Sequence, residues 1–183
     1  MTLLVVDNDS VYFDNLIDFL KNQNIIHTVL QPSNIDPTCL DSYNSIILSG
    51  RRNYNRQNNL INSKLIKHAI SSDVSLFGIC YGAEILALTV GGTLRKCKSP
   101  RRGNYTVEII KPNNLCNGTI HVLQSHSYEI GTLPSSIIPL AKSTDCSFEI
   151  IQYKDRPIFG TQFHPESTND GHAILKSFLK MTL

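Results

Sequence analysis

The sequence lacks several features that would place it in common protein classes. It has no apolar run of the roughly 20 residues that a membrane-spanning helix needs. It has no C-x-x-C pair, and its cysteines are widely spaced, which argues against a zinc site or a disulfide framework. Charge is nearly balanced, because 17 Lys and Arg face 15 Asp and Glu. That balance gives no electrostatic basis for binding nucleic acid or an anionic membrane.

The N-terminus and the cysteine usage indicate a cytoplasmic protein. Residues 1–7 predict a buried strand, with neither a basic segment nor a small-residue cleavage site, so we expect no signal peptide. The cysteines fit reduced thiols in the cytoplasm, and we expect neither a metal nor a cofactor. A length of 183 residues with 41% apolar residues fits one domain over 1–183.

The order of apolar segments predicts an α/β fold. In the first half, apolar strands are predicted at 3–7, 25–30, 45–48 and 75–79, with helices over 13–20, 59–71 and 83–90. Such alternation is typical of a mostly parallel sheet with helices on both faces. The second half predicts mainly antiparallel strands at 105–111, 119–124, 137–143, 148–153 and 157–163, then a helix over 171–183. We therefore expect three layers.

A short motif marks the junction between a predicted strand and a predicted helix. Residues 78–82 read G-I-C-Y-G, which has the form G-x-C-x-G. In the same context, G-x-S-x-G forms a nucleophile elbow. Cys80 would lie at a helix N-terminus, where the dipole and free N–H groups favour a thiolate. The N–H of Tyr81 could then donate to an oxyanion. A buried structural cysteine in a tight turn is the alternative.

A cysteine nucleophile needs a base and a group that orients the base. Among six histidines, His164 directly follows an apolar stretch and precedes Pro165-Glu166. Residues two apart in an extended chain project to the same side, so Glu166 could hold the imidazole in one tautomer. Cys80, His164 and Glu166 are therefore candidates for a catalytic triad.

These motifs, with Gly91-Gly92 between them and Q-F-H-P-E at 162–166, resemble class I (triad) glutamine amidotransferases over nearly the whole chain. The resemblance implies a flavodoxin-like fold. It also implies hydrolysis of L-glutamine through a γ-glutamyl thioester on Cys80, with ammonia passed to a synthase subunit in a hetero-oligomer.

Two stretches bear on the subfamily. Residues 5–16 are similar to the opening of the glutaminase subunits of anthranilate and para-aminobenzoate synthases, although the middle is shifted by one residue. On this basis the expected partner is a chorismate-binding synthase. Residues 122–126, V-L-Q-S-H, instead resemble the amidotransferase subunit of GMP synthase, which is the alternative. In this segment the resemblance implies substrate contacts from Ser125, Ser127 and Tyr128.

The chain departs from the family pattern at two positions near the expected substrate. The family usually has S-G-G-P after the third strand, whereas here Arg51 follows Gly50. The resemblance places Gly50 at the substrate and the Arg51 N–H in the oxyanion hole. A non-Gly residue resists positive φ, so we expect the hole to need assembly by a partner. Glu84 replaces the family glutamine that contacts the substrate.

These departures leave other functions open. One is a non-catalytic regulatory homologue, and another is a hydrolase of a different γ-glutamyl compound. The basic pair Arg101-Arg102 lies where relatives have a substrate- and partner-facing loop, although a solvated charged turn explains it equally well.

Overall fold

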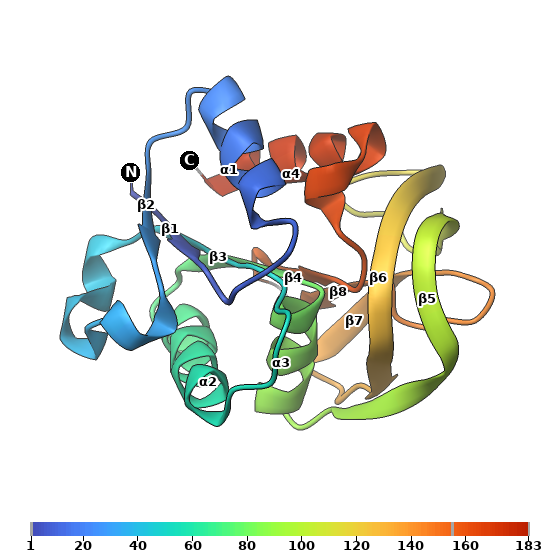
Figure 1. Cartoon of the computed structure of the whole chain (residues 1–183), viewed down its shortest axis with the longest axis horizontal. Coiled ribbons are helices and arrows are strands. Elements are labelled where there is room, and N and C mark those ends of the chain that lie inside the picture. The colour runs from blue at the N-terminus through green and yellow to red at the C-terminus, as the bar shows by residue number, and fades with distance from the viewer. Residues whose placement is uncertain (1, 155, 183) are drawn as a thin grey trace.

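The structure is a computed structural model that describes residues 2–154 and 156–182. Within these residues the strands form one nine-stranded sheet in the order β2-β1-β3-β4-β9-β8-β7-β5-β6 (Figure 1). The strands are β1 (Leu3–Val6), β2 (His27–Leu30), β3 (Ser45–Leu48), β4 (Ser75–Ile79), β5 (Thr93–Ile109), β6 (Thr119–Thr132), β7 (Ile137–Lys142), β8 (Ile150–Tyr153) and β9 (Ile158–Thr161). The α-helices are α1 (Phe13–Asn22), α2 (Arg56–Ser71), α3 (Tyr81–Thr89) and α4 (Asn169–Thr182).

Strands β2, β1, β3, β4 and β9 are parallel and lie between two layers of helices. Figure 1 shows α1 and α4 on one face of the sheet, and α2 and α3 on the other. Successive side chains of a strand point to opposite faces. Leu3 and Val5 accordingly pack in the core that includes Leu16 and Phe178, whereas Leu4 packs in the other core. The predicted three-layer α/β architecture is confirmed.

The second half of the sheet is antiparallel, as predicted, but its first two strands are much longer than expected. β5 begins at Thr93 and β6 runs to Thr132, so residues 93–104 and 125–132 extend the predicted strands into a long hairpin. Most of residues 93–104 are exposed, so this segment carries no apolar pattern that would have revealed a strand. β5 pairs with β7 only at Glu108 and Ile109. The rest of the hairpin projects beyond that pairing.

The helix ends differ from the prediction by a few residues. α2 begins at Arg56 because the Asn55 side chain accepts hydrogen bonds from the Gln57 and Asn58 N–H groups. Three short 3-10 helices, at Pro32–Asn34, Pro37–Ser42 and Pro165–Ser167, were not predicted. Leu183, the end of the predicted last helix, lies outside the described residues. Within those residues, none of the helices is both long and apolar enough to span a membrane.

Close packing of α3 on β9 predicts a measurable cost at Gly160. A Cβ at this position would lie 2.8 Å from the Ala83 Cβ and 3.2 Å from the Ile151 Cγ1. We expect Gly160→Ala to lower the free energy of unfolding by about 1–3 kcal/mol, measured by urea denaturation. Ala83→Gly alone should cost about 1 kcal/mol. Because the two changes relieve each other, the double variant should lose less than the sum, and strict additivity would contradict this packing argument.

Candidate active site

Cys80 occupies a strained turn between β4 and α3. Its backbone has φ 50° and ψ −101°, a region that non-glycine residues rarely adopt. Glycines on both sides make the turn possible. A Cβ at Gly78 would lie 2.4 Å from the Gly82 carbonyl carbon, and one at Gly82 would lie 2.6 Å from the Leu48 oxygen. The Cys80 N–H donates to the Thr161 carbonyl at 2.7 Å, which ties the turn to the end of β9.

His164 follows β9 and is fixed from several sides. Its N–H donates to the Leu123 carbonyl at 2.8 Å, and its Nδ1 lies 2.9 Å from Glu166 Oε1. Both side chains are buried. The Tyr12 ring lies against the imidazole, with 4.4 Å between ring centroids. A Cβ at Gly50 would lie 3.0 Å from the imidazole Cε1, so Gly50 leaves room for the ring.

Burial and charge act in opposite directions on the Cys80–His164 pair. Burial raises the pKa of the Cys80 thiol, and the positive charge of His164 and a hydrogen bond with it work against that rise. Burial also opposes protonation of His164, but attraction to the Cys80 thiolate and to Glu166 outweighs it and raises the pKa of the imidazole. The two partners therefore favour a thiolate–imidazolium pair that burial alone would suppress.

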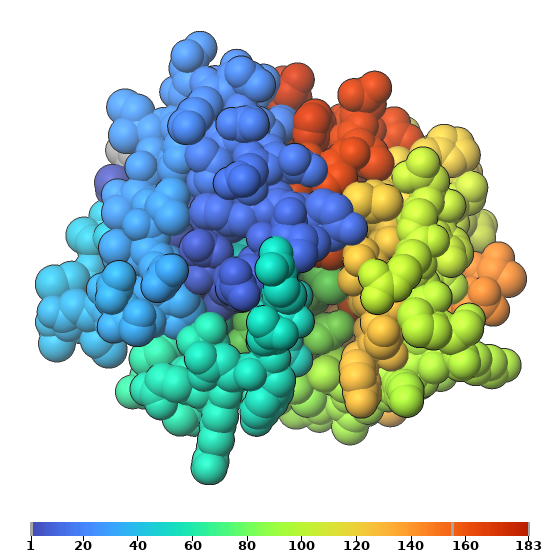
Figure 2. Space-filling model, in the orientation of Figure 1, coloured from blue at the N-terminus to red at the C-terminus, as the bar shows by residue number. Residues whose placement is uncertain are grey.

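A pocket of about 370 Å³ opens beside Cys80 and His164. Figure 2 shows a hollow between the blue and teal N-terminal segments and the yellow-green hairpin. Most residues proposed from the sequence line this pocket: Cys80, His164, Tyr81, Arg51, Glu84, Ser125, Ser127 and Tyr128. Gly50 and Glu166 do not line it, but both contact or flank His164. Residues from five separate segments of the chain thus meet at one cavity.

Glu84 is buried in the wall of this pocket. Its side chain accepts a hydrogen bond from Gln162 Nε2 at 3.1 Å. Burial raises its pKa to about 7, and that rise is opposed by Gln162 and by the charges of Arg51 and His164. The position agrees with the expectation that residues four apart on a helix, here Cys80 and Glu84, share one face. Near neutral pH this carboxylate is only partly ionised.

Arg51 holds its side chain against aromatic rings rather than projecting it freely. Its guanidinium lies 4.2 Å from the centroid of the Tyr81 ring, and its Nη1 donates to Asn59 Oδ1 at 3.2 Å. The Tyr81 hydroxyl also donates to Asn59 Oδ1, at 2.8 Å. Arg51 is not among the residues with positive φ. The loop after β3 is therefore fixed by side chains in place of the second glycine.

The two arginines of the pair at 101–102 have different environments. Arg101 is only 5% exposed, which rules out a solvated turn for this residue, whereas Arg102 is exposed and lines the pocket. Sequence reasoning also missed Tyr12, Gln162 and His126, which contact or line the site. Tyr12 and Gln162 lie inside stretches that were quoted for the resemblance, so their position next to the motifs was the available signal.

Comparison with known proteins identifies the class to which this fold and site belong. The family model described as "Glutamine amidotransferase class-I" matches residues 4–181. The chain belongs to this family, and its fold is the class I glutamine amidotransferase fold.

The relatives and solved structures refine this assignment. The glutamine-hydrolysing subunit of the GMP synthase of Thermoplasma volcanium is 30% identical, over 98% of this chain and 91% of that protein. The corresponding GMP synthase subunit of Pyrococcus furiosus is 27% identical, over 98% and 97%. A crystal structure from Thermoplasma acidophilum, described as a GMP synthase subunit, has a TM-score of 0.88 at 27% identity, covering 99% of this chain and 93% of that one. These relatives favour the GMP synthase alternative; the expected closeness to anthranilate synthase is not supported.

Glu84 makes the stability of the fold depend on pH. Its folded-state pKa is raised from 4.5 to about 7, so its contribution to stability is fully present below pH 4.5 and is lost as pH rises through about 7. The loss is at most about 3 kcal/mol at 1.36 kcal/mol per pKa unit. We expect Glu84→Gln to gain unfolding free energy relative to wild type as pH rises from about 5 to about 8, measured by urea denaturation.

The exposed Asp145→Asn serves as the control, because its side chain is 75% exposed and should show no such trend. A Glu84→Gln difference that is the same at both pH values would contradict the pKa shift.

Proposed function

We propose that this chain is the glutamine-hydrolysing subunit of a GMP synthase, formed as one domain over residues 1–183. The observation that carries the proposal is the Cys80 thiol at a strained strand–helix turn, beside an imidazole that Glu166 holds by a 2.9 Å hydrogen bond. The names of the relatives support the choice of synthase. We therefore place a GMP synthase catalytic subunit, in a hetero-oligomer, where a chorismate-binding one was first expected.

In this proposal Cys80 is the nucleophile and His164 carries the proton. The thiolate attacks the side-chain amide carbon of L-glutamine, and a bond forms between sulfur and carbon. His164 donates its proton to the departing nitrogen, so ammonia leaves and a γ-glutamyl thioester remains. The imidazole then takes a proton from water, the water attacks the thioester, and glutamate leaves. Glu166 stabilises the imidazolium through Nδ1.

The oxyanion formed in both steps needs hydrogen-bond donors, and we assign the backbone N–H groups of Tyr81 and Arg51. Tyr81 is the first residue of α3, where N–H groups have no partner within the helix and the helix dipole favours negative charge. Arg51 belongs to the loop that follows β3 and lines the same pocket. Gly50, Glu84, Ser125, Ser127 and Tyr128 are the proposed substrate contacts.

Two alternatives from the sequence weigh less. A non-catalytic regulatory homologue would not need a buried Cys–His–Glu arrangement facing a pocket, and both His164 and Glu166 are buried here. A hydrolase of another γ-glutamyl compound would use the same geometry but has no support among the relatives named above. The five free cysteines suit the reducing cytoplasm, where we place the protein.

Cys80→Ser should abolish ammonia release from glutamine. A serine hydroxyl at this position lacks the acidity of the thiol, so we expect kcat to fall by roughly 10⁴-fold or more. Coupled measurement of glutamate formation checks this, with Cys39→Ser as control because Cys39 is an exposed free thiol. Circular dichroism should show both variants folded. Glutaminase activity that survives in Cys80→Ser would refute the assignment of the nucleophile.

The isolated chain should be a weak glutaminase that the synthase subunit stimulates. Arg51 replaces a glycine in the loop that supplies one oxyanion donor, and loss of one such donor typically costs about 10²–10³ in rate. We expect kcat to rise by a factor within that range when the GMP synthase catalytic subunit of the same organism is added. Full activity of the chain alone would mean that the oxyanion hole is already formed.

A further inference from the structure

Positive charge is concentrated in one part of the β5–β6 hairpin. Residues 95–102, here called the basic segment, read R-K-C-K-S-P-R-R, so five of eight residues are Lys or Arg, against 17 in the 183-residue chain. All five belong to β5. Four of them, Arg95, Lys96, Lys98 and Arg102, are exposed. The segment forms a cationic ridge on a strand that has no sheet neighbour on one side along most of its length.

Most of this charge is not neutralised within the described part of the chain. Arg95 pairs with Glu129 at 2.7 Å, and Arg101 pairs with Asp145 at 3.4 Å. Lys96, Lys98 and Arg102 form no ion pair with any residue that the structure describes. Like charges on adjacent positions repel each other, so a surface of this kind gains from a negatively charged partner.

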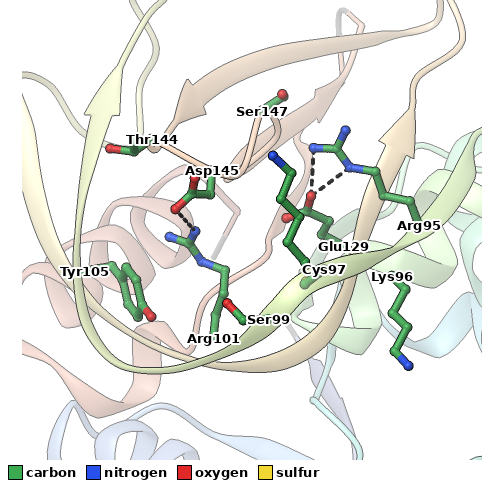
Figure 3. A pocket seen from close by; sticks show the side chains of 11 residues that line it. Arg95, Lys96, Cys97, Ser99, Arg101, Tyr105, Glu129, Thr144, Asp145 and Ser147 are labelled. Carbon is green, nitrogen blue, oxygen red and sulfur yellow. Dashed lines mark hydrogen bonds and ion pairs between the residues drawn. The ribbon is translucent and has the colours of Figure 1, made fainter.

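Next to the ridge lies a cavity of about 590 Å³ with a buried arginine in its wall (Figure 3). Arg101 lies 4.2 Å from the centroid of the Tyr105 ring, donates to Ser143 at 3.0 Å, and also donates to Gln124. These contacts hold the guanidinium in one orientation before any partner arrives. Such preorganisation lowers the entropy that binding costs. Figure 3 shows Arg101, Arg95, Thr144 and Ser147 around the cavity.

The ridge and the cavity are continuous with the pocket that contains Cys80. Arg102 lines that pocket and is paired with Ser125, a proposed substrate contact, in the β5–β6 register. His126 also lines the pocket, and its Nδ1 lies 3.6 Å from the Cys97 sulfur, which lines the cavity. A protein that covers the mouth of the active-site pocket would therefore also lie against the basic segment.

From these observations we infer that the basic segment is the docking surface for an acidic face of the synthase subunit, with a carboxylate side chain of that subunit entering the cavity to pair with Arg101. The inference rests on the proposed function, which requires a partner at the pocket. Lysines on open strands also prevent edge-to-edge aggregation. That role needs neither a rigid buried arginine nor a cavity beside the ridge.

The test is the affinity of charge-reversed variants for the synthase subunit. We expect Lys96→Glu combined with Lys98→Glu to raise the Kd for the GMP synthase catalytic subunit of the same organism by about tenfold or more at low salt, with a smaller effect at high salt. The matched control is Lys64→Glu with Lys67→Glu on α2, which makes the same charge change at two exposed positions and should leave the Kd nearly unchanged. Neither pair lines the pocket, so glutaminase activity without the partner should be unaffected.

A second variant tests the cavity without changing charge. Ser147 is exposed and lines the cavity, so Ser147→Trp should fill it and weaken docking while leaving activity without the partner intact. Unchanged affinity in both the charge-reversed and the Ser147→Trp variants would overturn the inference. So would binding of inorganic phosphate in the cavity, lost in Ser147→Trp, with docking unaffected, because the cavity would then be a small-anion site.

The failure of this inference is distinguishable from failure of the proposed function. If wild-type protein neither hydrolyses glutamine nor binds the synthase subunit, the proposed function is wrong. If it does both and the charge-reversed and Ser147→Trp variants behave as wild type, only the docking surface is wrong.

Discussion

The parallel pairing of β4 with β9 is the contact on which the rest of the site depends. It runs in register from Leu76 with Ile158 to Ile79 with Thr161, and the hydrogen bond from Cys80 N–H to the Thr161 carbonyl continues it beyond the strand. Cys80 and His164 are distant in sequence, and this pairing brings them to the same edge of the sheet. In open α/β sheets, ligands bind at the carboxyl ends of the strands. A displaced β9 would separate the thiol from its base without changing either residue.

The same pairing explains why the turn at Cys80 stays strained. Backbone in a sparsely populated φ/ψ region persists only where the surroundings over-determine it. Here Gly78, Gly82 and Gly160 each allow a close approach of backbone that a Cβ would block. The energy that holds the turn therefore comes from the packing of α3 between β3 and β9. Stability of the core and the geometry of the thiol are one property of this chain.

The sequence predicted this region well because local pattern and tertiary role coincide there. Buried parallel strands appear as continuous apolar runs, and the predicted bounds of β3 and β4 are those of the structure. The helical spacing of Cys80 and Glu84 likewise placed the carboxylate at the pocket, since i and i+4 share a face. The hairpin could not be found in the same way. Residues 93–104 are mostly exposed, and what makes them a strand is pairing with β6 rather than burial.

Arg101 shows a second limit of sequence reasoning. A pair of arginines in a polar stretch predicts solvent exposure, yet one of them is buried because its partners come from other strands and loops. Gln124 lies on β6 and Ser143 follows β7, so no local pattern indicates the network. The subfamily was misjudged for a related reason. The opening stretch at 5–16 contributes to β1, the turn after it and α1, and these are elements that the whole fold requires, whichever synthase is the partner.

The two faces of β5 connect these findings. Side chains alternate along a strand, so neighbouring residues can serve different surfaces. Arg101 belongs to the cavity and Arg102 to the active-site pocket, although both lie on one strand. Because Arg102 pairs with Ser125 and Arg101 with His126, a displacement of β5 also moves the β6 residues that face Cys80. A partner that grips Arg101 would thus act on the geometry of the substrate pocket through two adjacent backbone positions.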